Sequence, residues 1–244
     1  AGLEVTVPDS LHPAPVLEAG AGGITICEVH LRRGPGFGLI IEPRSDEEIR
    51  ADVTDFAEYV RGSDASLSEG EGEEASQGIS KEVERAIRNL ANLRVRREKT
   101  AEGKTVRRDQ AKELAQQFDS TRELVVEILS LMGLPHRDRR DIWHDVVTGK
   151  PPLEWLKDTF EMINNGRHPE FTLPRRIEVV VPHTLLQADD LAIRIIDTKG
   201  IDRTAARADL EGLLDDPHTI AVLCSGCNNA PAAEARLLLE RAKE

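Results

Sequence analysis

The stretch Leu191-Ala192-Ile193-Arg194-Ile195-Ile196-Asp197-Thr198-Lys199-Gly200 decides the fold class of this 244-residue sequence. It reads as an apolar strand that runs directly into Asp-x-x-Gly. Ligands of α/β proteins bind at the carboxyl ends of sheet strands. A carboxylate placed there can hold Mg²⁺, which favours one or two carboxylates together with waters and phosphate oxygens. The following glycine amide can turn toward a phosphate.

Other segments show the same strand character on both sides of a long middle region. Residues 24–31 and 176–182 alternate or run apolar, and residues 219–224 form a near-continuous apolar run typical of a strand buried on both faces. Residues 37–42 follow the turn Gly34-Pro35-Gly36, which predicts a hairpin with residues 24–31. We therefore expect an α/β protein.

Composition and periodicity divide the chain into four parts. Residues 1–61 belong to an α/β domain and end in a helix, which Ser45 and Glu48 open as a capping box. Residues 62–78 hold five acids, no base and much Ser and Gly, so we interpret them as a flexible linker. Residues 79–170 are expected to form a helical insertion, and residues 171–244 to return to the α/β domain.

Within the middle region the apolar spacing predicts several helices. One begins near Ile79, one long helix covers residues 111–131, and shorter ones cover residues 138–147 and 152–163. The basic run 94–108, with seven Lys or Arg, is interpreted as the tip of a helical hairpin that could touch phosphates, lipid headgroups or an acidic partner. Trp143 and Trp155 are expected to anchor the helical core.

The motif at residues 195–202 resembles switch II of P-loop GTPases, in particular the dynamin-like group. Gly23-Ile24-Thr25, just before a strand, is similar to the switch I loop of the same family. The resemblance implies a partial P-loop NTPase-like three-layer sheet, interrupted by the helical insertion. It also implies that the complete protein binds and hydrolyses Mg²⁺-GTP.

The family pattern assigns a role to each matching residue. Asp197 would hold Mg²⁺ through water, Gly200 would contact the γ-phosphate, and Thr25 would contact both and close the site. Thr198 and Lys199 would line the nucleotide beside them.

Two further motifs of the family are absent from the 244 residues. There is no Gly-x-x-x-x-Gly-Lys-Ser/Thr phosphate loop, since Gly103-Lys104-Thr105 has Glu at position 98, and no Asn/Thr-Lys-x-Asp base-reading motif follows residue 200. We therefore expect a central fragment, inactive and poorly stable alone, whose missing motifs lie outside it. An ATP-using relative stays open.

Charge and cysteine usage constrain partners and location. With 44 acidic and 32 basic residues, the net charge of −12 argues against nucleic acid as the main partner, without excluding a local basic patch. Three cysteines are too few for a disulfide scaffold and favour a cytoplasmic location. The alternative to a GTPase is a non-enzymatic helical scaffold, in which the insertion binds a protein partner or mediates self-assembly. A membrane role stays open.

Two further clusters receive structural interpretations. Cys224-Ser225-Gly226-Cys227 could bind metal or cycle redox state, but only Cys27 remains as a further thiol ligand. Asp141 and His144 would lie one helical turn apart, but three interleaved arginines favour a salt-bridged helix face.

Overall fold

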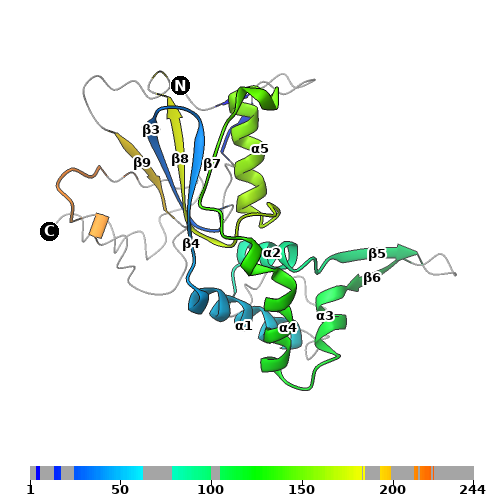
Figure 1. Ribbon diagram of the computed structural model, residues 1–244. Coiled ribbons are helices and arrows are strands. Elements are labelled where there is room, and N and C mark those ends of the chain that lie inside the picture. Colours follow the sequence, from blue (N-terminus) through cyan, green and yellow to red (C-terminus); the bar gives the residue numbers. More distant parts are fainter. Residues whose placement is uncertain are drawn as a thin grey trace, which may run out of the picture.

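A five-stranded mixed sheet forms the centre of the molecule, with strand order β7-β4-β8-β3-β9 (Figure 1). The computed structural model describes residues 4–5, 14–17, 25–62, 79–99, 105–182, 184, 193–198, 212–213, 215–220 and 222. The sheet strands are β3 (Glu28–Gly34), β4 (Gly38–Pro43), β7 (Asp141–Trp143), β8 (Pro174–Pro182) and β9 (Arg194–Asp197). The expected α/β class is thus confirmed.

Strand β8 lies between β3 and β4, parallel to the first and antiparallel to the second. The predicted hairpin of residues 24–31 with 37–42 is therefore wrong, although both segments contain a strand. The cause is the apolar content of β8, in which Ile177, Val179, Val180 and Val181 are all fully buried. A strand buried in this way takes the centre of a sheet, where it has neighbours on both sides.

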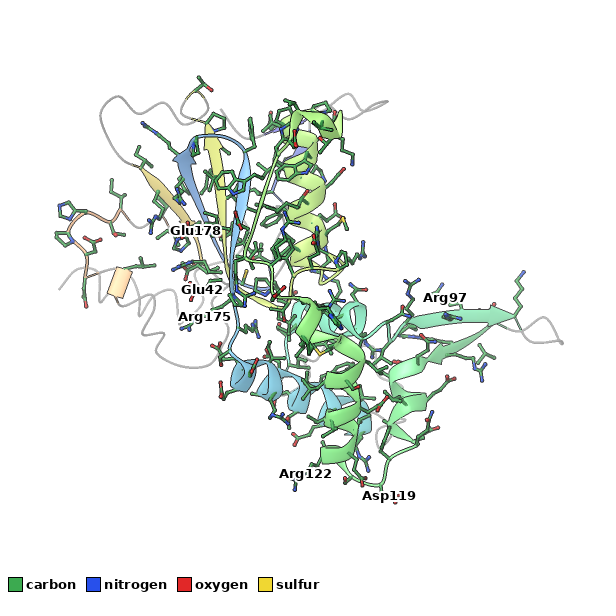
Figure 2. The ribbon with its side chains drawn as sticks, in the orientation of Figure 1. Glu42, Arg97, Asp119, Arg122, Arg175 and Glu178 are labelled. Atoms are coloured by element: carbon green, nitrogen blue, oxygen red, sulfur yellow. The ribbon has the colours of Figure 1, made fainter. Side chains whose placement is uncertain are left out.

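The two faces of the sheet differ in character. One face presents Leu39, Val179 and Leu31 to the helix α5 (Pro152–Asn164), whose Leu156 and Phe160 join the same apolar core. The opposite face carries charged side chains, among them Glu42 and Glu178 (Figure 2). This alternation is the period-two pattern of strands with one face on the core.

A helical unit lies beyond one end of the sheet strands, where β4 leads into α1 (Figure 1). It contains α1 (Asp46–Gly62), α2 (Lys81–Leu90), α3 (Gln110–Ala115) and α4 (Thr121–Met132). The predicted capping box of α1 is confirmed, since the Ser45 amide donates to Glu48 and the Glu48 amide to the Ser45 hydroxyl. The apolar face of α1 is buried, at Ile49, Val53, Phe56 and Val60. Among the described residues, no helix has the length and apolar character needed to cross a bilayer.

Several predictions for the middle region are wrong. The basic run forms a β-hairpin, β5 (Val95–Lys99) with β6 (Thr105–Asp109). The helix expected at 138–147 is β7 followed by a 3₁₀ turn at Val146–Thr148, because residues 141–143 pair with the edge of β4. The long helix at 111–131 is two helices, because Ser120 and Glu123 form a capping box that starts α4 anew.

Two more expectations fail on packing. Trp155 is buried on α5, but Trp143 lies on β7 over Gly38 and is 39% exposed, so it anchors no helical core. The run 219–224 is not a buried strand where the structure describes it, since Ile220 and Val222 are 90% and 79% exposed. A buried strand needs a paired neighbour, and no described strand pairs with these residues.

The remaining described strands are short. β1 (Glu4–Val5) pairs with β2 (Ala14–Pro15) as a separate two-stranded sheet. A second 3₁₀ turn, at Leu134–His136, follows Gly133, which ends α4 in the left-handed conformation.

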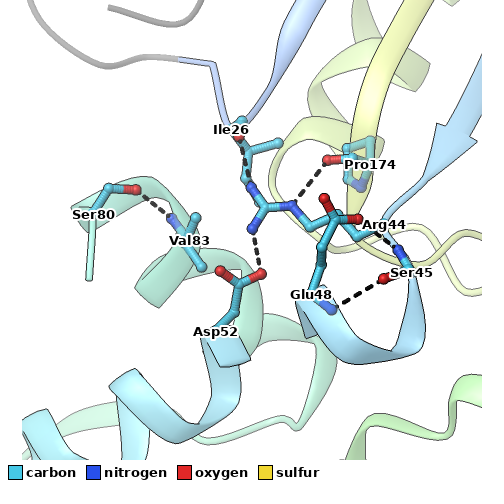
Figure 3. Close-up of polar contacts among 8 residues, drawn as sticks. All are labelled: Ile26, Arg44, Ser45, Glu48, Asp52, Ser80, Val83 and Pro174. Carbon is cyan, nitrogen blue, oxygen red and sulfur yellow. Dashed lines mark hydrogen bonds and ion pairs between the residues drawn. The ribbon is translucent and has the colours of Figure 1, made fainter. Parts of the chain in front are cut away.

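Arg44 joins the sheet to the helical unit (Figure 3). Its guanidinium pairs with Asp52 on α1 and donates to the backbone carbonyls of Ile26 and Pro174, which precede β3 and begin β8. Both side chains of the ion pair are mostly buried, at 13% and 21% exposure. One side chain therefore fixes two strand starts and one helix.

Replacing Arg44 by Met should lower the free energy of unfolding by about 2–3 kcal/mol, because Asp52 and the two carbonyls lose their donor. The measurement is urea unfolding, with Arg50→Met on the exposed side of α1 as the control, which should change stability by less than about 0.5 kcal/mol. Equal losses in the two variants would contradict this role.

Gly166 follows α5 and lies directly against the backbone of α2. Its φ is +66°, and a β-carbon built there would lie 2.7 Å from the carbonyl oxygen and 3.1 Å from the Cα of Ala86. Gly149 has a matching φ of +68° but no heavy atom within 4 Å of the same position. Substituting alanine at each of the two glycines therefore distinguishes the cost of a left-handed backbone from the cost of a steric clash with α2.

Gly166→Ala should therefore destabilise the protein more than Gly149→Ala. The second variant carries only the cost of a left-handed alanine, about 1–2 kcal/mol, while the first must also displace α2. Thermal unfolding of both variants checks this. Equal melting temperatures would show that α2 yields without cost.

Candidate functional site

Thr25 and Asp197 lie toward the same end of the β3–β9 strand pair. β9 runs antiparallel to β3, with Asp197 opposite Val29, so the end of β9 lies beside the start of β3. Thr25 precedes β3 by three residues, and Thr198 follows β9 directly. The structure thus places three of the predicted site residues toward one end of this strand pair, with Asp197 facing Val29. The other two, Lys199 and Gly200, lie outside the described residues.

The backbone after Thr25 is held firmly. The buried Ile26 donates its amide to the Asn164 side-chain oxygen at 2.9 Å and accepts from Arg44 at 3.2 Å. Asn164 is fully buried at the end of α5, and its side-chain oxygen binds the backbone just before β3. These contacts set where the half-buried Thr25 lies relative to the end of β9.

Asp197 carries the charge at this end of the strand pair. Its side chain is exposed, and it forms no ion pair with any other described residue. Partial desolvation raises the pKa of its carboxyl above the ordinary value. Desolvation of this kind disfavours the ionised form until a cation or hydrogen-bond donor arrives.

The donor set at this end of the strand pair fits Mg²⁺ in one specific way. The described residues contain no group of three or more His, Cys, Asp or Glu that could hold a metal ion. A cage made of protein ligands is therefore not formed by them. A strand-end carboxylate such as Asp197 fits Mg²⁺, which takes one or two carboxylates and completes its shell with waters and phosphate oxygens.

A ladder of charges crosses the sheet face opposite α5, and sequence reasoning missed it. Arg32 donates to Glu178 at 2.8 Å, and Arg176 lies 2.6 Å from Glu42 and 3.8 Å from Glu178 (Figure 2). The hydrogen bond from Arg32 lowers the pKa of Glu178. Alternating charges along residues 28–32 and 176–178 were the available signal, but pairing them required the strand order.

A buried histidine lies on the same face. His30 is 4% exposed, contacts Glu28 through Nε2 and stands opposite Ile196 of β9. Its Nδ1 has no hydrogen-bond partner among the described residues. Glu28 and His30 flank Val29, which faces Asp197, and the pair was not predicted as part of a site.

The competing clusters do not assemble into sites in the described part of the chain. Cys27 is buried, while Cys224 and Cys227 lie outside the described residues. Asp141 and His144 are not one helical turn apart, because β7 is extended. His144 instead contacts the Lys150 carbonyl at 2.9 Å and stacks edge-on against Trp155.

The structure defines a mixed α/β protein with Asp197 at the end of β9 and Thr25 ahead of β3. Comparison with protein-family models and with curated proteins finds no match for the chain.

The charge ladder gives a pH-dependent prediction. Because the pKa of Glu178 is lowered in the folded state, its stabilisation is present above the unfolded-state pKa of about 4.3 and is lost as pH falls through the folded value. Glu178→Gln should therefore cost about 1–2 kcal/mol at pH 7 and less near pH 4. Urea unfolding of both proteins at the two pH values tests this, and a pH-independent difference would refute it.

Proposed function

We propose that this chain supplies the Mg²⁺- and γ-phosphate-contacting part of a nucleoside-triphosphate site, in a cytoplasmic protein resembling the dynamin-like GTPases. The supporting observation is the antiparallel register of β3 and β9, which places the strand-end Asp197 opposite Val29, four residues along the chain from Thr25.

In this proposal each residue acts by position and charge. Asp197 orients the waters of the ion, Thr25 closes over the phosphate from the switch-like loop, and the Gly200 amide donates to the γ-phosphate. Thr198 and Lys199 line the same side of the nucleotide. The bound Mg²⁺ supplies positive charge to the phosphate oxygens, and catalysis rests on electrostatic positioning of the phosphate and an attacking water.

The phosphate cradle of such a site must come from elsewhere. The 244 residues contain no Gly-x-x-x-x-Gly-Lys-Ser/Thr, so the proposal assigns that loop to a segment outside them. These residues alone should not turn over nucleotide. GTP is proposed over ATP on the resemblance of residues 195–202, and an ATP preference is one outcome that the test distinguishes.

The test is nucleotide hydrolysis by the whole protein that contains these residues. Asp197→Asn should lower Mg²⁺-dependent GTP turnover by about a hundredfold, because an electrostatic contact to the reacting phosphate is lost. Asp119→Asn, in an exposed loop of the helical unit, is the matched control and should leave turnover unchanged (Figure 2). Unchanged turnover in Asp197→Asn, or no Mg²⁺-dependent nucleotide binding at all, would overturn the proposal.

The second candidate is a non-enzymatic scaffold that binds a protein partner, or a second copy, through the helical unit. The observation in its favour is the exposure of Val126 and Leu131 on α4, at 58% and 43%. The absence of nucleotide binding in the assay above would favour this candidate.

A further inference from the structure

The hairpin of β5 and β6 extends away from the rest of the molecule (Figure 1). Its two strands with the preceding Arg94 hold six basic residues, Arg94, Arg96, Arg97, Lys99, Arg107 and Arg108, against two acidic ones. Val95, Val106 and the described basic side chains are exposed on both faces of the ribbon. No apolar core explains why this segment is a ribbon.

Arginines stand directly opposite one another along the ribbon. The register pairs Arg97 with Arg107 on one face and Arg96 with Arg108 on the other. Like charges directly across an antiparallel pair are destabilising. The Arg108 guanidinium forms an ion pair with the Glu113 carboxylate at 3.0 Å. Arg97 and Arg107 form no ion pair with any other residue that the structure describes. The ribbon therefore maintains a repulsion that a bound polyanion would remove.

A basic hollow continues from the root of the ribbon. It has a volume of about 440 Å³ and lies between α2 and the start of β5, with Lys81, Arg85, Arg88 and Arg94 in its lining. Arg88 is neutralised by Glu84 and Asp109. Lys81 and the exposed Arg94 extend the positive charge of the ribbon onto the helical unit.

We propose that the ribbon and this hollow bind double-stranded DNA, with the ribbon in the major groove and its arginines on the phosphates of both walls. A two-stranded ribbon fits the major groove, which is about 12 Å wide, whereas the deep and narrow groove of duplex RNA excludes it. Arginine forks match phosphate oxygens. Opposed arginines on both faces suit two flanking walls of phosphate.

Other polyanions match this arrangement less well. A flat lipid surface would engage one face of the ribbon and leave the opposite arginines in water. A single-stranded nucleic acid would need aromatic side chains for stacking, and the ribbon has none. The acidic net charge of −12 is no obstacle, because the ribbon holds its cations clear of the body and screening limits repulsion to about 8 Å at physiological salt. The proposal does not depend on the nucleotide site.

The test uses Arg97→Glu in the 244-residue chain and a fluorescent duplex of about 20 base pairs, at about 50 mM salt and above. The substitution places Glu opposite Arg107, which replaces a repulsion by an attraction, so the melting temperature should stay equal or rise. DNA affinity should fall about tenfold or more, and the dependence of log K on log salt should become shallower by about one or two units. Loss of binding without loss of stability separates a DNA contact from a structural role.

Arg122→Glu is the matched control, because Arg122 is an exposed arginine on α4 and the charge change is the same (Figure 2). It should retain the affinity of the parent protein. Three results would overturn the proposal: no binding of the duplex by the parent protein, equal affinity of the two variants, or a preference for duplex RNA or phosphatidylserine vesicles over DNA.

Discussion

The guanidinium of Arg44 is the contact on which the arrangement of the whole molecule depends. It binds the carbonyls where β3 and β8 start, and it pairs with Asp52 on α1. A cation this buried requires all of its partners, since an unpaired charge in the interior is costly. The same contact holds the backbone that precedes β3 and follows Thr25. Arg44 therefore helps to set the position of Thr25 in the candidate site.

Other arginines join segments by the same chemistry. Arg137 donates to the carbonyls of Met132 and His168, and Arg61 donates to those of Phe118 and Asp119. Desolvation lowers the pKa of Arg137, a sign of how far its head lies inside the protein. Aromatic residues make up only 3% of the sequence. The guanidinium groups of these arginines, with five donors each, help to hold the loops against the core.

The chain uses its remaining basic residues differently. Across β3, β8 and β4, cations alternate with anions and cancel them, as in the ladder of Arg32, Glu178 and Arg176. Along β5 and β6, cations face cations. The first arrangement stabilises the fold and the second opposes it. Charges are balanced across the sheet but repel one another along the ribbon. The ribbon is therefore the surface that an anionic partner would bind.

Local signals in the sequence determined the helix start at Ser45 and the apolar face of α1. They also determined the strand character of residues 28–34, 38–43, 174–182 and 194–197. They placed Asp197 at a strand end, which is the basis of the candidate site. Strand order was decided only by the tertiary structure, because β8 enters between β3 and β4 after the 130 residues that follow β4. The ribbon at residues 95–109 was missed for a related reason. Its exposed, charged strands have no apolar period to reveal them, and cross-strand pairing alone makes them a sheet.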